Sequence, residues 1–183
     1  MGEELGVPAR YPEGRNLVED LGLWWVLHTK PRCERHIAQY LLNRDISYYL
    51  PLYRRKIRYG NLGRTRTREV PLFNGYICFA LDKQDHKLLY DSKKFVRIIK
   101  VDDQLQFVKE LQAIARAVET QDDLLVRGGF TLGRRILIVS GPMAGHEGVI
   151  VRKQGKRHLA LSVKMFNQTV LVRLDQETML EPL

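Results

Sequence analysis

The sequence predicts an α+β fold in two units, an α/β sandwich followed by a small all-β barrel. Aromatic and β-branched runs alternate with segments of helical period between residues 23 and 119. A stretch with paired Asp and paired Gly follows at 120–133. Residues 134–183 hold short apolar runs separated by turn glycines. Short strands of this kind close into a barrel, because closure removes exposed sheet edges.

The elements of the first unit alternate in a characteristic order. We expect strands at 23–29, 46–59, 69–81 and 95–101, and helices after Pro31, within 82–92 and at 102–119. Proline is tolerated in a first helical turn, and Asp102 or Asp103 can cap the last helix. The order strand, helix, strand, strand, helix, strand, helix predicts a ferredoxin-like sandwich over residues 23–119.

Composition sets the boundaries of these units. Residues 1–22 contain four glycines and two prolines among acidic side chains and show no apolar period. We therefore expect a flexible leader there. The composition shift at 120–133 predicts a linker, and residues 134–183 are expected to form the barrel.

Positive charge is concentrated in one stretch of the chain. The 183 residues carry a formal net charge of +9, and residues 28–69 alone carry +8. A cationic surface attracts phosphate backbones, because binding releases the counterions condensed on nucleic acid. A nucleic acid or a nucleoprotein is the expected partner.

Several classes of protein are disfavoured. No apolar run approaches the roughly 20 residues that span a bilayer, and the acidic N-terminus does not resemble a secretory signal. Two cysteines, Cys33 and Cys78, cannot form a disulfide framework, so we expect a cytoplasmic protein without a membrane partner. Cys33 with His28 or His36 lacks a third orienting group. Because metal-ligand spacing and a phosphate-binding loop are also missing, we expect neither an enzyme, a cofactor nor a metal.

The segment VSGPMAGHEGVIV at 139–151 has the glycine spacing of a compact strand–turn–strand unit. Its turn residues are Gly141, Pro142, Gly145 and Gly148. This spacing resembles the KOW motif of NusG/Spt5 transcription factors and of several ribosomal proteins. The resemblance implies an SH3-like KOW barrel.

The first unit resembles the N-terminal domain of the same family. WWVLHTKPRCERHIAQYLLNR is similar to the opening of a NusG N-terminal domain, and YYLPLYRRK and VPLFNGYICF are similar to two further stretches. Asn74 stands where the family's turn has proline. The resemblance covers residues 23–183, and the HTKPR and LP segments look most like the specialised RfaH-type and capsule-operon antiterminator paralogues.

The resemblance implies two binding surfaces on the first unit. An apolar patch would bind the clamp of the largest RNA polymerase subunit through Trp25, His28, Phe73, Tyr76 and Cys78. Core packing is the alternative for each of these aromatic side chains. The non-template DNA strand would pass the residues matching Lys30, Arg32, Arg35 and Lys93. Positive charge adds Arg64, Arg66 and Lys94 to the candidate nucleic-acid-binding residues. A solvated charged surface is the alternative for each of these.

The function implied is that of a monomeric transcription elongation and antitermination factor that suppresses pausing or termination at particular operons. The barrel would recruit a second partner, either a small-subunit ribosomal protein through Phe166 or a termination factor. Core packing is again the alternative for Phe166. Two other functions stay open: a general NusG-type elongation factor and a ribosome-associated RNA-binding KOW protein.

Overall fold

The computed structural model describes residues 6–59, 64–81, 86–120, 124–129 and 133–183. The chain divides into two compact units. The first unit combines residues up to Pro51 with Pro71–Val108, and the second combines Leu52–Val70 with Lys109–Leu183. No helix in the described ranges is long and apolar enough to cross a membrane.

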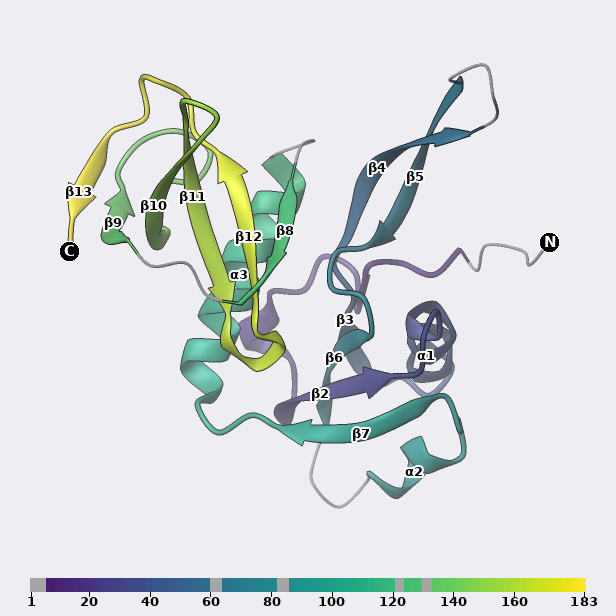
Figure 1. The fold of residues 1–183 in the computed structure, drawn as a ribbon. Coiled ribbons are helices and arrows are strands. Elements are labelled where there is room, and N and C mark those ends of the chain that lie inside the picture. The colour runs from purple at the N-terminus through teal and green to yellow at the C-terminus, as the bar shows by residue number, and fades with distance from the viewer. Residues whose placement is uncertain (1–5, 60–63, 82–85, 121–123, 130–132) are drawn as a thin grey trace. The chain divides into compact units, whose positions relative to one another are not determined.

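The first unit is built on a five-stranded antiparallel sheet in the order β1-β3-β6-β2-β7 (Figure 1). Its strands are β1 (Arg10–Tyr11), β2 (Leu23–Thr29), β3 (Ser47–Tyr49), β6 (Tyr76–Leu81) and β7 (Phe95–Lys100). Without β1 and a hairpin described below, the strands follow one another along the chain as β2, β3, β6 and β7. In the sheet they lie side by side as β3-β6-β2-β7. This is the strand order of the ferredoxin-like sheet that the sequence predicts.

Three helices accompany the strands along the chain. Helix α1 (Glu34–Leu42) contacts β3 and β6 and buries Ile37, Ala38 and Leu41, the residues whose spacing predicts it. Helix α2 (Lys87–Tyr90) is a single turn. Helix α3 (Gln104–Thr120) is capped by Asp103, whose Oδ1 accepts a hydrogen bond from the Gln106 N–H at 3.0 Å.

The N-terminal segment, predicted as a flexible leader, contains a short strand and a 3-10 helix within residues 6–22, and residues 1–5 lie outside the described part. Strand β1 pairs with β3, and Asn16 caps a short 3-10 helix, Leu17–Glu19. Leu17 is buried, and its carbonyl accepts a hydrogen bond from Trp24 Nε1 at 3.1 Å. Such isolated anchors produce no apolar period, so sequence patterning does not detect them.

The second unit contains a six-stranded antiparallel sheet in the order β13-β9-β10-β11-β12-β8. Its strands are β8 (Leu125–Gly128), β9 (Arg134–Ile138), β10 (Glu147–Lys153), β11 (Lys156–Val163), β12 (Gln168–Arg173) and β13 (Leu180–Pro182). Strand β8 pairs with β12, although its residues fall in the stretch predicted as a linker. A four-residue strand that ends on Gly128 and is followed by Gly129 is too short for composition to reveal.

The second unit also includes the last part of α3. Arg116 Nε donates a hydrogen bond to the Pro142 carbonyl at 2.8 Å, and the Lys164 N–H donates one to Glu110 Oε2 at 3.1 Å. The helix predicted as the end of the first unit thus also stabilises loops of the second sheet.

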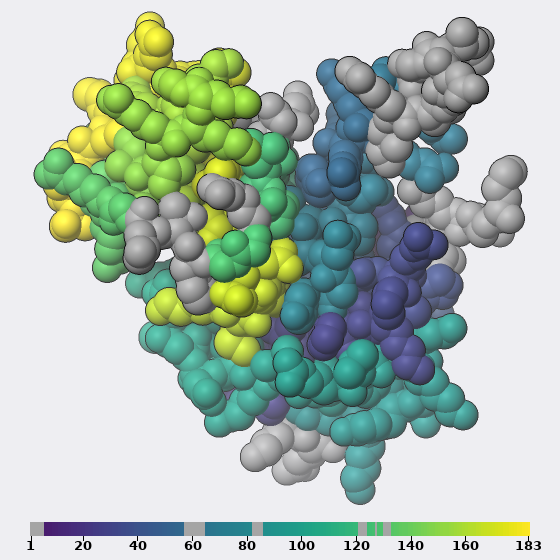
Figure 2. Space-filling view, in the orientation of Figure 1, coloured from purple at the N-terminus to yellow at the C-terminus, as the bar shows by residue number. Residues whose placement is uncertain are grey.

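The remaining strands form a separate two-stranded ribbon, β4 (Leu52–Tyr59) with β5 (Arg64–Pro71). Leu50 and Pro51 interrupt the long strand predicted at 46–59, so that its first part joins the sheet as β3 and its second part becomes β4. Residues 54–56 of β4 are exposed, and the blue segment of this strand lies at the surface in Figure 2.

Candidate functional site

One end of the first sheet brings two rings and a cation into a row. His28 on β2 pairs with Tyr76 on β6 and with Arg97 on β7. Residues directly opposite each other on neighbouring strands share a face. The His28 and Tyr76 rings stack with centroids 5.0 Å apart and planes 17° apart. Both rings are partly accessible and Arg97 is exposed, so the row can contact a partner.

Two predicted basic loops meet beside this row. The Lys30 N–H donates a hydrogen bond to the Lys94 carbonyl at 2.9 Å, which joins the loop after β2 to the loop before β7. Lys30, Arg32, Lys93 and Lys94 are all exposed. We call His28, Lys30, Tyr76, Lys94 and Arg97 the basic-aromatic corner.

Both loops contain a non-glycine residue with a left-handed backbone, as do turns elsewhere in the described chain. Arg32 has φ of 60° and Lys93 has φ of 53°, in the left-handed region that non-glycine residues seldom occupy. Such conformations persist where the surrounding structure fixes them, and they are frequent in binding sites. Arg35, in the first turn of α1, is partly exposed.

A buried glutamate that sequence reasoning missed holds the turn that precedes Tyr76. Glu34 is 6% exposed, and its Oε1 accepts a hydrogen bond from the Gly75 N–H at 2.6 Å. The Gly75 carbonyl accepts a second bond from the Thr29 N–H at 2.8 Å. Asn74 stands where the family that the sequence resembles has proline. The two bonds made by the Gly75 backbone restrain the turn without a proline ring. An acidic residue in the first helical turn of an otherwise basic stretch was the available signal.

Arg97 was also missed by sequence reasoning. It lies on β7, and its place beside His28 depends on the strand register, which alternation alone does not fix. Its charge in a short apolar strand was the only signal.

The predicted apolar patch does not form one surface. Trp25 is 6%, Phe73 1% and Cys78 0% exposed, which leaves only His28 and Tyr76 accessible among the five residues. Trp25 also faces the side of the sheet opposite to His28, because side chains alternate along a strand. The sheet is buried on both faces near its centre, so aromatic residues there indicate core packing.

The contacts of Trp25 and Cys78 agree with a core position. Trp25 Nε1 donates a hydrogen bond to the Leu81 carbonyl at 3.1 Å, and its ring meets the His86 ring edge-on, with centroids 4.1 Å apart. Burial raises the pKa of the Cys78 thiol, so it stays protonated and unreactive at neutral pH.

Two of the nominated basic residues lie on the ribbon of the second unit. Arg66 is exposed, whereas Arg64 begins β5 and its side chain lies outside the described part.

The segment predicted as a strand–turn–strand unit, 139–151, contains the turn between β9 and β10 and the first part of β10. Gly141 and Gly145 both have φ of 83°, and the Gly145 N–H donates a hydrogen bond to the Ile138 carbonyl at 2.8 Å. A Cβ on Gly148 would lie 2.6 Å from Leu159 Cδ1, so only glycine fits against β11. Pro142 is exposed within the turn.

Phe166 is a core residue, not a surface contact. Its side chain is 4% exposed at the end of a 3-10 turn, Lys164–Phe166, and Asn167 follows with φ of 50°. A buried ring offers no surface for a partner, so the structure does not support the prediction that Phe166 touches a ribosomal protein.

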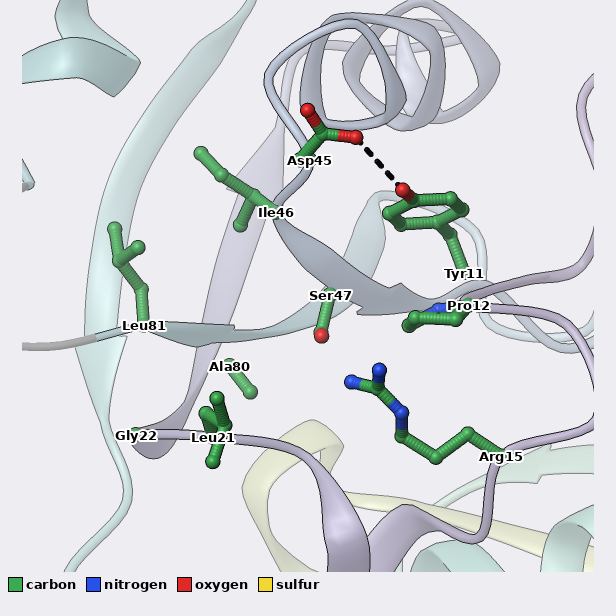
Figure 3. Close-up of a pocket in the computed structure, with 10 residues that line it drawn as sticks. All are labelled: Tyr11, Pro12, Arg15, Leu21, Gly22, Asp45, Ile46, Ser47, Ala80 and Leu81. Carbon is green, nitrogen blue, oxygen red and sulfur yellow. Dashed lines mark hydrogen bonds between the residues drawn. The ribbon is translucent and has the colours of Figure 1, made fainter.

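A pocket of about 450 Å³ lies between the N-terminal segment and strands β3 and β6 (Figure 3). Aliphatic side chains line it together with Arg15, Ser47 and Asp45. Tyr11 Oη donates a hydrogen bond to Asp45 Oδ1 at 2.7 Å.

Comparisons with known proteins identify the first part of the chain. The family model described as transcription termination factor nusG matches residues 22–128. A solved structure titled as domain interaction in Thermotoga maritima NusG is 16% identical over 83% of this chain and 92% of that chain, with a TM-score of 0.45. A structure of the MjSpt4:Spt5 complex is 15% identical over 88% of this chain and 97% of that chain, with a TM-score of 0.31.

These structural likenesses are too weak to carry an argument, and comparison with curated proteins gives no match. The family model, however, covers more than half of the sequence. The chain therefore belongs to the NusG family of transcription factors.

Proposed function

We propose that this protein is an elongation and antitermination factor that binds RNA polymerase at the clamp of the largest subunit and holds the non-template DNA strand, so that pausing or termination is suppressed. We further propose an operon-specific role of the RfaH type, exerted by a monomer in the cytoplasm. The observation that carries the proposal is the basic-aromatic corner, where stacked and accessible rings stand beside exposed cations.

The corner suits an unpaired strand. Single-stranded DNA is bound by cations that follow its phosphates and by rings on which bases stack, each stack contributing about 1–3 kcal/mol. Tyr76 and His28 supply the rings, and Lys30, Lys94 and Arg97 supply the cations. Because stacking and phosphate contacts need no specific base edge, the corner would bind single-stranded DNA of any sequence. Neighbouring residues such as Arg32 and Arg35 would add a preference for particular operons.

Contact with the polymerase requires a different apolar surface from the one the sequence suggested. Exposed apolar side chains of the first unit include Tyr90 on α2 and Val96 on β7. The Tyr90 ring lies 5.4 Å from the Phe95 ring, measured between centroids. This α2–β7 surface is our candidate for the clamp contact, with Tyr76 and His28 beside the DNA.

A factor that binds both clamp and DNA suppresses pausing only if it prefers one state of the enzyme. A ligand shifts a conformational equilibrium by its difference in affinity for the two states. If the factor binds the closed clamp more tightly by about 1.4 kcal/mol, the ratio of closed to open enzyme rises roughly tenfold.

The second unit would bind a further partner. The strand–turn–strand unit at 139–151 and the six-stranded sheet support a KOW barrel in the SH3-like class. A small-subunit ribosomal protein or a termination factor remains the proposed partner, through exposed residues and without the buried Phe166 ring.

The test is a reconstituted transcription reaction with core polymerase, in which pause lifetimes are measured. We expect the wild-type protein to shorten pauses and Tyr76→Ala and Arg97→Gln to lose most of this effect. Lys100→Gln is the matched control, because Lys100 is an exposed cation at the other end of β7. Equal shortening by all four proteins would remove the corner from the mechanism.

Two outcomes would favour the alternatives. Co-sedimentation with ribosomes without any binding to polymerase would favour the RNA-binding KOW protein. Occupancy across most transcribed genes, measured by chromatin immunoprecipitation, would favour a general elongation factor over an operon-specific one.

A further inference from the structure

The β4–β5 ribbon carries the densest positive charge of the chain. Residues 52–71 include seven Lys or Arg and a single acidic residue, Glu69. Within the described part of the ribbon, the exposed cations are Arg54, Arg55, Lys56, Arg66 and Arg68. Such a density repels itself unless anions neutralise it, so the ribbon is built for a polyanionic partner.

These cations point to both faces of the ribbon. Side chains alternate along a strand, so Arg54 and Lys56 lie on one face of β4 and Arg55 lies on the other. The three are consecutive in sequence and all exposed, so neither face of β4 is covered.

The register extends this division to β5. At the base of the ribbon the Leu72 N–H donates a hydrogen bond to the Pro51 carbonyl at 2.8 Å, which sets these residues opposite each other. Strands of eight residues each follow from that point. Continued without a bulge, this register places Arg68 opposite Arg55, and Arg66 then shares their face.

Each face therefore has its own cations: Arg54 and Lys56 on one, and Arg55, Arg66 and Arg68 on the other. A flat anionic surface, or a single strand of DNA lying along the ribbon, neutralises one face only. A groove of a double helix has a phosphate backbone on each side.

We propose that the β4–β5 ribbon enters the major groove of double-stranded DNA and binds both phosphate backbones without reading the sequence. The dimensions fit, because a strand of eight residues spans about 27 Å. The major groove of B-DNA is about 12 Å wide and admits a two-stranded ribbon. The exposed hydroxyls of Thr65 and Thr67 add hydrogen-bonding groups between the cations.

The described side chains of the ribbon favour a duplex over a single strand; the side chain of Tyr59, at the end of β4, lies outside the described part. Unpaired strands are bound largely by stacking of bases on aromatic rings. Among its described side chains the one aromatic is Tyr53, which is partly buried at the base. Duplex binding by the ribbon is thus distinct from binding of the unpaired strand by the basic-aromatic corner.

The test measures binding of the full chain to free DNA by fluorescence anisotropy over a range of salt concentrations. The probes are a short duplex of mixed sequence, one of its single strands, an RNA duplex, and a DNA duplex with bulky groups at pyrimidine C5, which fill the major groove. The variants are R54Q/K56Q for one face and R55Q/R66Q/R68Q for the other. The control is R152Q/K156Q, which removes two exposed cations of β10 and β11.

We expect both face variants to weaken binding to the duplex, and the control to leave it unchanged. The slope of log K against log salt becomes less steep by about 0.9 for each phosphate that the protein no longer neutralises, so by up to about 1.8 for R54Q/K56Q. Binding to the single strand changes little in either variant. The C5-substituted DNA duplex binds more weakly because its added groups occupy the major groove. The RNA duplex also binds more weakly, because the major groove of A-form RNA is too narrow for side chains.

Three results would overturn the proposal: a weaker duplex affinity in only one of the two face variants, equal decreases for single and double strands, or full affinity for the C5-substituted duplex. Circular dichroism of each variant confirms that the fold is kept, as expected for exposed side chains. Because no polymerase is present, a failure here is separate from a failure of the pause assay.

Discussion

Replacing Glu34 should loosen the turn that presents Tyr76. Its Oε1 accepts the Gly75 N–H at 2.6 Å, and the carboxylate is almost completely buried. In Glu34→Ala this donor loses its partner in a partly buried position. In Glu34→Gln an amide oxygen of the same reach can still accept the bond.

The size of the effect follows from the hydrogen bond that the substitution removes. A hydrogen bond to a charged acceptor contributes about 1.5–3 kcal/mol, and an unsatisfied buried donor costs about 1–3 kcal/mol. We expect the free energy of unfolding to fall by about 2–3 kcal/mol in Glu34→Ala. In Glu34→Gln, which keeps a neutral bond, we expect a fall of about 1 kcal/mol.

Urea denaturation followed by tryptophan fluorescence measures this difference for the correct unit. The chain has two tryptophans, Trp24 and Trp25, and both lie in the first unit. With a slope of about 1–3 kcal/mol/M, the alanine variant should unfold roughly 1 M earlier. Equal midpoints for the alanine and glutamine variants would refute the reasoning, since the bond would then contribute nothing.

Three further substitutions test the packing. Gly148→Ala should destabilise the second unit by about 1–3 kcal/mol through overpacking, whereas Gly128→Ala, which meets nothing within 4 Å, should not; urea titration followed by circular dichroism compares them. Tyr48→Phe removes a 2.9 Å bond to the Pro8 carbonyl and should cost about 1 kcal/mol. Burial raises the pKa of Tyr48 to about 12, so its contribution to the free energy of unfolding is complete below about pH 10 and is lost as the pH rises through about 12. The stability of the phenylalanine variant should not show this fall. Phe166→Ala should destabilise the second unit by about 3–5 kcal/mol in the same titration, and an unchanged midpoint would contradict its burial.

Much of the fold could be predicted from the sequence because apolar periodicity determines it. Strands β2 and β7 and helices α1 and α3 follow their patterns closely, whereas the strands predicted at 46–59 and 69–81 are each divided in two. The order of the N-terminal segment could not be predicted, because it depends on single contacts such as the Leu17 carbonyl with Trp24 Nε1. Strand β8 was missed because four residues are too few to show a period.

The candidate site was predictable only in part, for a related reason. The charge cluster at 28–69 and the family resemblance pointed to Lys30, and the resemblance pointed to Lys93; both are exposed, as cations usually are. Burial is decided by what covers each face of a sheet, so Phe73 was taken for a surface residue although it is core. Arg97 needed the register between β2 and β7.

The central claim is that the basic-aromatic corner meets the unpaired non-template strand during transcription. The most direct measurement places a photo-crosslinking residue at exposed Asn74, next to Tyr76, in a reconstituted elongation complex with labelled DNA strands. The same residue at Leu105, exposed on α3, is the control. We expect crosslinks from position 74 to the non-template strand that disappear when Lys30 and Arg97 are changed to Glu. Crosslinks that persist after these charge reversals, or equal crosslinks from both positions, would contradict it.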